Sequence, residues 1–331
     1  MQALSLSPPL LTSPPRSLRR KSSNTFRAPR MDRHARISSQ FAPLLHRDLA
    51  LELASLMESR LGSDLLPSSV PDNVRSFQNQ SGTSFGSLDI RYGAPGSSVD
   101  FLLESWLHCK VPTGAIDITT LLVYQNDSTD APHFNLEFIQ AGPTSLVLLL
   151  DLIPRRDLSF CPDYIDTFYQ GTNVDKPRQD LEKLPQVVPY RSPSLYIRSI
   201  WSPTAILVSI NCGEGGATKM EEIIKGTVAS AAKEVLGIWL ERCFGTGTGT
   251  EMGEEEREYM IRRDRVVKSK SIEIDLSANL PRLFDPDLAN RVIAEIQKAC
   301  ASHTWCVMSS AQLDTRLLFH ITLAATRRKY Y

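Results

Sequence analysis

A strand pattern in the segment 133–158 most constrains how this 331-residue chain can fold. Phe134, Leu136 and Phe138 alternate with polar neighbours, which is the period of two that a strand with one buried face requires. A Gly-Pro turn and a continuous apolar run over 146–150 follow, and such a run is typical of a strand covered on both faces. We therefore predict a β-hairpin at the centre of a sheet.

The polar face of the first strand in this hairpin carries His133, Asn135 and Glu137. Two explanations fit a carboxylate at such a position. Either the face lies in water, or it lines a cleft in which Glu137 takes part in proton chemistry. The pattern itself leaves both explanations open.

Further alternating segments lie on both sides of the hairpin and indicate a sheet of consecutive strands. Short turns separate most of them, which implies antiparallel pairing along the chain rather than β-α-β units. The predicted strands cover residues 87–92, 99–109, 115–123, 195–200 and 205–210.

Helical periodicity occurs before and after the main series of strands. It predicts helices over residues 42–66, 161–170, 219–244, 251–268 and 286–299. Together these patterns predict a layered α+β or α/β/α arrangement, and of the two we expect an α/β fold, namely an α/β/α sandwich in which helices flank a central, mainly antiparallel sheet.

The first 40 residues differ in composition from the remainder of the chain. They are rich in Ser, Pro and Arg and lack the apolar core of an export signal, which favours a chloroplast or mitochondrial transit peptide. A disordered basic tail is the alternative. Their net charge is +7, so residues 41–331 carry −7, a balance that gives little support for nucleic-acid binding. The charged residues of this leader are Arg16, Arg19, Arg20, Lys21, Arg27, Arg30, Arg33 and Arg36 against Asp32.

Two motifs resemble binding sites but lack essential parts. The glycine-rich segment 245–249 follows a predicted helix, whereas a phosphate loop joins a strand to a helix and ends in Lys followed by Ser or Thr. Cys300, His303 and Cys306 are closely spaced, but three such ligands without a distant partner pair rarely make a structural zinc site. We interpret the first motif as a linker and predict no bound metal.

Two charged segments lie near the end of the predicted fold. Residues 271–276 alternate, which predicts a strand with Glu273 and Asp275 on one face, either in water or beside a site. The preceding basic run is either a solvated helix or a docking surface for an acidic partner. It contains Arg257, Arg262, Arg263, Arg265, Lys268 and Lys270.

Five longer strings resemble plant red chlorophyll catabolite reductases, and they occur in the order found in that family. The resemblance runs from about Pro43 to about Ala299. It implies the ferredoxin-dependent bilin reductase fold, which agrees with the predicted antiparallel sheet between helical layers. The strings are SWLHCKVPTG (105–114), SLVLLLDLIPRRDL (145–158), RSPSLYIRSIWSPTA (191–205), AAKEVLGIWLERC (231–243) and KSIEIDLSANLPRLF (270–284).

The resemblance implies that the chain is an enzyme of chlorophyll breakdown. Such an enzyme reduces the C20/C1 double bond of red chlorophyll catabolite, an open-chain tetrapyrrole, to give the primary fluorescent catabolite. The family binds neither flavin nor metal and receives single electrons from reduced ferredoxin. Two alternatives remain open, a non-catalytic bilin-binding chaperone and a bilin reductase for another linear tetrapyrrole.

The resemblance also implies roles for particular residues. Glu137 and Asp275 match the acidic residues that flank the reacting end of the bilin, and Glu137 is expected to be the first proton donor. Trp201 matches a residue that packs against the substrate, although it is bulkier than the Phe or Val expected there. Weaker expectations for the substrate-binding surface concern the pair Trp106 and His108, the cleft floor at His133 and Asn135, and Arg155, which either pairs with a bilin propionate or faces solvent.

From these observations we expect three parts, namely a disordered chloroplast transit peptide over 1–40, a bilin reductase domain over 41–299 and a divergent C-terminal extension over 300–331. The expected location is the chloroplast, in the stroma or at the thylakoid surface. The expected partners are ferredoxin, which is acidic, the tetrapyrrole substrate, pheophorbide a oxygenase and other enzymes of the same breakdown, and a second copy of the chain in a homodimer.

Overall fold

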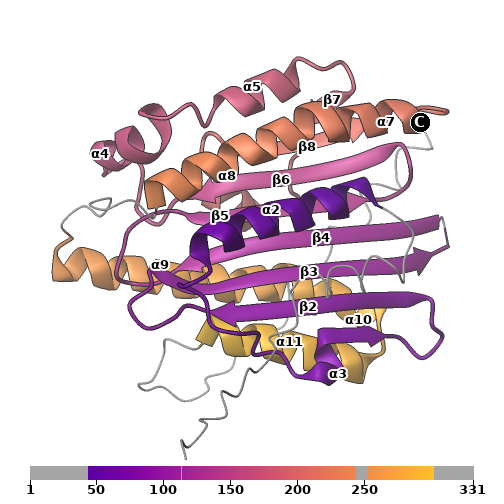
Figure 1. Ribbon diagram of the computed structural model, residues 1–331, viewed down its shortest axis with the longest axis horizontal. Helices are drawn as coiled ribbons and strands as arrows, with labels where there is room; N and C mark the ends of the chain where they lie inside the picture. The colour runs from indigo at the N-terminus through magenta and orange to yellow at the C-terminus, as the bar shows by residue number, and fades with distance from the viewer. Residues whose placement is uncertain (1–43, 113, 244–251, 302–331) are drawn as a thin grey trace, which may run out of the picture. The chain divides into compact units, whose positions relative to one another are not determined.

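The computed structural model of this protein describes residues 44–112, 114–243 and 252–301 (Figure 1). The predicted transit peptide over 1–40 and most of the predicted extension, from residue 302 onward, lie outside the described residues. None of the helices within the described residues is long and apolar enough to cross a bilayer.

An antiparallel sheet forms the centre of the described fold (Figure 1). Its spatial order is β1-β2-β3-β4-β5-β6-β8-β7, so the chain builds most of the sheet by pairing each strand with the one before it. This confirms the predicted antiparallel meander. The strands are β1 (Ser76–Gln78), β2 (Ser84–Tyr92), β3 (Val99–Val111), β4 (Gly114–Gln125), β5 (His133–Gln140), β6 (Ser145–Ile153), β7 (Val187–Pro189) and β8 (Ile206–Asn211).

The predicted hairpin is formed by β5 and β6 and lies in the interior of the sheet. β5 pairs with β4 on one side and β6 on the other, while the second edge of β6 pairs with β8. Gly142 in the connecting turn has a φ of 146°, a left-handed conformation that side chains with a Cβ rarely adopt. The Gly-Pro signal in the sequence therefore marks a turn that requires its glycine.

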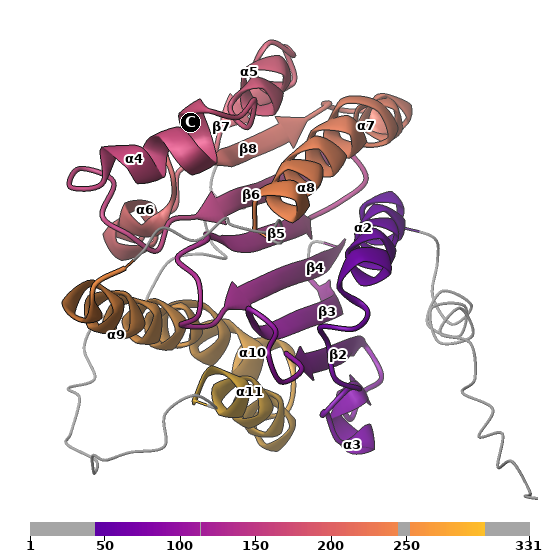
Figure 2. The ribbon, with the colours of Figure 1, turned by 60° about the vertical axis from the view of Figure 1, so that its left-hand side comes forward.

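One layer of helices covers the sheet face to which Phe134, Leu136 and Phe138 point. All three side chains are buried in the larger apolar core, together with residues of β6 and β8 and of the covering helices. Figure 2 shows α2 and α8 on this side of the sheet. The helices whose buried residues join this core are α2 (Leu45–Leu61), α4 (Pro162–Ile165), η1 (Asp166–Gln170), α5 (Lys176–Glu182), α7 (Ala217–Ile223), η2 (Ile224–Val228) and α8 (Ala229–Cys243).

A second layer of helices lies across the opposite face (Figure 2). A smaller apolar core joins β1 to β4 with this layer and with α3 (Asp72–Arg75). The predicted α/β/α sandwich is therefore confirmed. The second layer contains α9 (Glu254–Ser271), η3 (Ile272–Leu276), α10 (Ser277–Leu283) and α11 (Pro286–Ala301).

The strand predicted over 195–200 is wrong, because this segment forms helix α6 (Leu195–Ile200). Ser194 caps its first turn, where the side-chain oxygen accepts a hydrogen bond from the Ile197 backbone N–H at 3.2 Å. In addition, β7 occupies the edge of β8 that faces away from β6, so that edge offers no place for 195–200.

The strand predicted over 271–276 is also wrong. The chain continues from α9 without a break into the π-helical turn η3 and then into α10. Side chains two positions apart point in nearly opposite directions on a helix, so Glu273 and Asp275 do not share a face. Glu273 is exposed and pairs with Lys270 at 2.8 Å.

Candidate active site

The register of the sheet decides which side chains face the second helical layer. Cα partners form one row across the strands, and side chains in such a row stand on the same face. Glu137 lies in a row that avoids the larger apolar core. The row consists of Ser105 in β3, Thr120 in β4, Glu137 in β5, Leu149 in β6 and Leu207 in β8.

A cavity lies between this face and the second helical layer. All five residues of the row line it, and so does Asp275 of η3. Most of its other lining side chains are apolar, and they come from the sheet, from the segment 195–201 and from the second helical layer. An apolar cleft with a few converging polar groups is the usual form of a small-molecule site. The structure therefore brings Glu137 and Asp275 into one cavity.

The two carboxyl groups are held in an environment that disfavours ionisation. The side chains of Glu137 and Asp275 are partly accessible because they face the cavity, whose lining is mostly apolar. Burial, together with the nearby Asp275 charge, raises the pKa of Glu137 to about 8. Burial also raises the pKa of Asp275, against the opposing effect of a 2.9 Å hydrogen bond donated by Asn279 Nδ2. Near neutral pH this pair can hold at least one proton.

Tyr190 is a cavity residue that the sequence patterns did not indicate. It follows β7, and its backbone N–H donates a 2.8 Å hydrogen bond to the carbonyl of Leu207, which extends the row that contains Glu137. Burial and the neighbouring Glu137 and Asp275 charges raise the pKa of its phenol. In sequence it lies within a proline-rich connection without periodicity, and such a segment gives no signal of a site.

Asn135 and Trp201, both predicted to bind substrate, line the same cavity. The Asn135 Nδ2 atom is buried and has no hydrogen-bond partner among the described residues. A buried donor without a partner is unfavourable by about 1–3 kcal/mol, so a carbonyl or carboxylate on a bound molecule would relieve this. The cavity wall thus offers a hydrogen-bond donor, Asn135 Nδ2, at a place where a polar group of a ligand is expected.

Trp201 is fixed by its neighbour in the chain. Ser202 donates two hydrogen bonds to the buried Asp151, from its backbone N–H at 2.8 Å and from its hydroxyl at 2.5 Å. Burial raises the pKa of Asp151 to about 7, although the hydrogen bonds from Ser202 oppose the shift. This anchor ties the chain directly after Trp201, at the end of α6, to β6.

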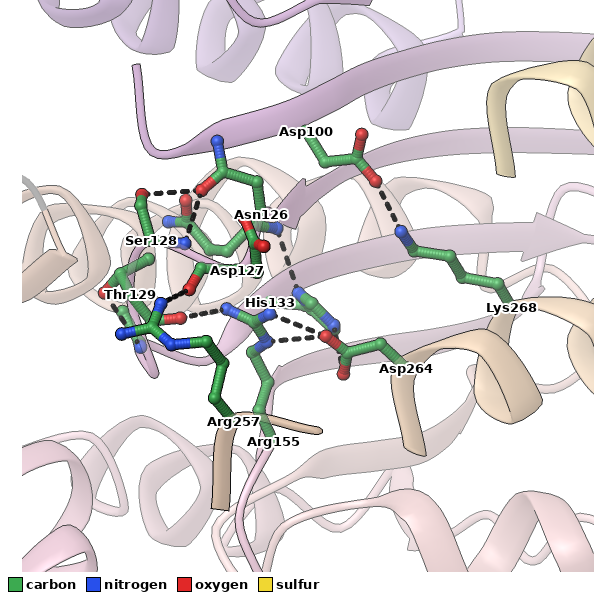
Figure 3. A network of polar contacts seen from close by, with 12 residues as sticks. Asp100, Asn126, Asp127, Ser128, Thr129, His133, Arg155, Arg257, Asp264 and Lys268 are labelled. Atoms are coloured by element: carbon green, nitrogen blue, oxygen red, sulfur yellow. Dashed lines mark hydrogen bonds and ion pairs between the residues drawn. The ribbon is translucent and has the colours of Figure 1, made fainter. Parts of the chain in front are cut away.

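His133, expected at the cleft floor, and Arg155, expected either to pair with a bilin propionate or to face solvent, are instead members of a buried polar cluster (Figure 3). Arg155 contacts Asp264 through Nε at 2.9 Å and Nη2 at 2.6 Å, and neither His133 nor Arg155 lines the cavity. His133 Nδ1 accepts a 3.0 Å hydrogen bond from the Gln125 backbone N–H, and Nε2 lies 3.2 Å from Asp264 Oδ1. Burial lowers the pKa of His133 to about 4, so its neutral form donates to Asp264.

Trp106 and His108 do not line the cavity either, because they stand on the other face of β3. The Cα partner of Trp106 is Thr119 in β4, whose own partner in β5 is Phe138, so these side chains share the face of the larger core. The Arg47 guanidinium lies 4.9 Å from the Trp106 ring centroid, and His108 Nδ1 lies 2.8 Å from Asp117 Oδ1. On β3 three of the four cavity-facing side chains are apolar (Phe101, Leu103 and Leu107, beside Ser105), whereas β5 contributes Asn135 and Glu137 together with Ile139.

The basic run does not form a single surface. Lys268 is buried and lines the cavity, while Arg262 and Arg265 are exposed and Arg263 is half-buried. The predicted metal motif is only partly described: Cys300 lines the cavity, and His303 and Cys306 lie outside the described residues. Within the described residues no group of three His, Cys, Asp or Glu side chains is placed to hold a metal ion.

Sequence comparisons identify similar proteins over most of the chain. The family model of red chlorophyll catabolite reductase (RCC reductase) matches residues 45–298. The chain is 59% identical over 256 residues to red chlorophyll catabolite reductase 1, chloroplastic, of Oryza sativa subsp. japonica, covering 77% of each chain. It is 46% identical over 255 residues to red chlorophyll catabolite reductase, chloroplastic, of Arabidopsis thaliana, covering 76% of this chain and 79% of that protein.

A solved structure has the same fold. The tomato phytochromobilin synthase in complex with biliverdin matches with a TM-score of 0.60 at 15% sequence identity, over 78% of this chain and 84% of that one. This similarity confirms the fold that the sequence strings implied, with its antiparallel sheet between helices.

Proposed function

The chain belongs to the red chlorophyll catabolite reductase family and is an oxidoreductase, and from this we propose that it reduces the C20/C1 double bond of red chlorophyll catabolite. The product is the primary fluorescent catabolite. The observation that supports this most directly is the pairing of Glu137 and Asp275, both with raised pKa, in one largely apolar cavity of a bilin reductase fold.

The proposed reaction adds two electrons and two protons to one carbon–carbon double bond. The electrons come singly from reduced ferredoxin, and the chain itself supplies protons and position. A carboxyl group donates a proton effectively near neutral pH when its pKa lies close to the ambient pH. Protonated Glu137 would therefore give the first proton to the singly reduced tetrapyrrole, and Asp275 would give or relay the second.

The cavity also explains how side reactions would be limited. A radical formed after the first electron must be kept from water and oxygen until the second electron arrives. Apolar walls from β3, β4 and α10 would cover much of the bound tetrapyrrole and limit its contact with water. We propose that Trp201 packs against the tetrapyrrole and that Asn135 donates a hydrogen bond to one of its carbonyl groups.

We also propose a chloroplast location, since two relatives are named as chloroplastic. The transit peptide expected over 1–40, the position in the stroma or at the thylakoid surface, the homodimer and the contacts with pheophorbide a oxygenase remain predictions. Sedimentation of the purified protein without residues 1–40 measures the oligomeric state.

The decisive experiment is an anaerobic assay with reduced ferredoxin, red chlorophyll catabolite and the protein without residues 1–40. We expect blue fluorescence to grow only when all three are present. Glu137→Gln and Asp275→Asn should each slow turnover by about 10²-fold or more, the usual range for loss of a general acid, while the tetrapyrrole still binds.

The outcomes separate the alternatives. Binding of the red catabolite without turnover by the folded wild-type protein would indicate a bilin chaperone. Faster turnover of biliverdin than of the red catabolite would indicate a reductase for another linear tetrapyrrole. Full activity in either carboxyl variant would exclude that residue as a proton donor.

A further inference from the structure

The cavity contains a cation at the end remote from the carboxyl pair. Of the cavity-lining residues within the described chain, Lys268 alone carries a basic side chain. Its ammonium group donates a hydrogen bond to the buried Asp100, as Figure 3 shows, and lies 4.8 Å from the Tyr124 ring centroid and 5.4 Å from that of Phe101. These contacts fix the ammonium group at the cavity wall.

The two charged ends are separated along the sheet and along the helix alike. Tyr124 follows Thr120, the partner of Glu137, by four positions on β4, which corresponds to about 13 Å of strand. Lys268 precedes Asp275 by seven positions on the continuous helical segment α9–η3, which corresponds to about 10 Å of axis. The cavity thus has an acidic end and a cationic end.

The polar groups at the cationic end are hydrogen-bond donors. Burial raises the pKa of the Cys300 thiol to about 12 and raises that of the Tyr124 phenol, so both keep their protons near neutral pH. Cys300 and Tyr124 line the cavity together with Lys268. An ammonium, a phenol and a thiol that all donate are suited to an anionic group of a ligand.

The other basic side chains near this region do not line the cavity. Arg155 donates hydrogen bonds to Asp264 and to the Thr129 carbonyl, and it lies outside the cavity. Lys270, two residues after Lys268, pairs with Glu273 on the exposed side of the helix. Lys268 therefore replaces Arg155 as the candidate for contact with a propionate of the tetrapyrrole.

We propose that Lys268, with Tyr124 and Cys300, binds a carboxylate of the tetrapyrrole and so orients the molecule with its reducible end at Glu137 and Asp275. This inference rests on the proposed substrate class. It assigns a specificity role to Lys268, because a tetrapyrrole bound the other way round would place its carboxylate beside two carboxyl groups.

The test compares red chlorophyll catabolite as the free acid with its methyl ester, in both binding titrations and turnover. The wild-type protein should bind the acid about tenfold or more tightly than the ester, the range expected for a charge-assisted hydrogen bond. In Lys268→Met this preference should disappear, and in Lys268→Arg it should persist. Lys270→Met is the matched control and should keep the wild-type preference.

A second variant controls for misfolding caused by removing the Lys268 charge from beside the buried Asp100. Lys268→Met combined with Asp100→Asn removes both charges and should also bind acid and ester equally. Equal binding of acid and ester by the wild-type protein, with normal turnover, would overturn the inference and leave the proposed function intact. If the wild-type protein prefers the acid to the ester but does not reduce it, the inference about Lys268 stands and the proposed reaction is wrong. If the protein binds no tetrapyrrole at all, both are wrong.

Discussion

Glu137 combines two properties that act against each other at the level of a single residue. Burial beside Asp275 raises its pKa from 4.5 to about 8, and this shift is what would allow it to donate a proton at neutral pH. A carboxyl whose pKa is raised in the folded state favours folding below its unfolded pKa, and this contribution is lost as the pH rises through the folded pKa. The proposed catalytic group is therefore a source of instability in alkaline solution.

We accordingly expect Glu137→Gln to be more stable than the wild-type protein above about pH 8 while it loses activity. The gain should be about 1–3 kcal/mol in the free energy of unfolding, reduced from the full pKa difference because the cavity admits water. Urea unfolding at pH 5 and pH 9 measures it, and the gain should be found only at pH 9. Glu258→Gln, an exposed substitution on α9, is the control.

The pH dependence of turnover tests the same residue. The rate should fall as the pH rises through the pKa of Glu137, because the ionised form has no proton to give. A rate that stays constant between pH 6 and pH 9, with substrate saturating, would contradict the role of Glu137 as the acid.

At the residue scale the sequence predicted part of the site. The alternation in β5 correctly separated Phe134, Leu136 and Phe138 from Asn135 and Glu137. The sequence did not indicate that Trp106 lies on the same sheet face as Phe138. Which face a side chain of β3 shares with β5 depends on the register of β3 with β4 and of β4 with β5, and the alternation within one strand does not determine that register. Tyr190 and Lys268 were missed as cavity residues for a similar reason, since only tertiary packing brings them to the cavity.

At the element scale, the cluster of His133, Arg155 and Asp264 joins three parts of the chain. It connects the start of β5, the turn after β6 and the middle of α9 (Figure 3). Burial opposes ionisation of Asp264, but the adjacent His133 and the Arg155 charge hold its pKa below the ordinary range. The helix that supplies Lys268 is thereby fixed to the sheet.

Asp264→Ala should lower the free energy of unfolding by about 3–5 kcal/mol, because it leaves the buried Arg155 guanidinium without its charge partner. Urea unfolding at pH 7 measures the loss. Glu258→Ala, on the exposed side of the same helix, should change stability by no more than about 0.5 kcal/mol. The difference between the two variants should shrink at acidic pH, since a depressed carboxyl pKa stabilises only above that pKa. A loss under about 1 kcal/mol at pH 7 would show that the cluster does not anchor the helix.

The elements predicted wrongly share a physical cause. Short segments such as 195–200 and 271–276 alternate in composition, but a strand also needs a neighbouring strand edge for its backbone hydrogen bonds. The edge of β8 is taken by β7, and the segment 271–276 continues a helix already formed by α9. The long, regular elements were predicted correctly because their periodicity extends over many residues.

At the scale of the whole molecule, helix α9 connects the outer surface with the cavity. Arg262 and Arg265 are exposed on it, whereas Lys268 one turn further on lines the cavity. A protein electron donor with acidic groups that docks on this helix would lie close to the bound tetrapyrrole. The half-buried Arg263 is less suited to such docking than Arg265.

Charge reversal of Arg262 and Arg265 to Glu should raise the ferredoxin concentration needed for half-maximal rate and flatten its dependence on salt, because electrostatic attraction at the docking surface is lost. Steady-state assays at several ionic strengths measure both. The control reverses Lys219 and Lys225, which are exposed on the opposite helical layer. An unchanged salt profile in the Arg262 and Arg265 variant would place the docking surface elsewhere.

The alternation of β5 has an evolutionary consequence. Residues 134, 136 and 138 are committed to the larger core, while 135, 137 and 139 face the cavity. Substitutions at the second set can alter proton supply or ligand shape without removing a side chain from that core. Substitutions in this strand can therefore change which tetrapyrrole is bound while the fold is retained. We expect sequence differences between related reductases to concentrate at the cavity-facing positions.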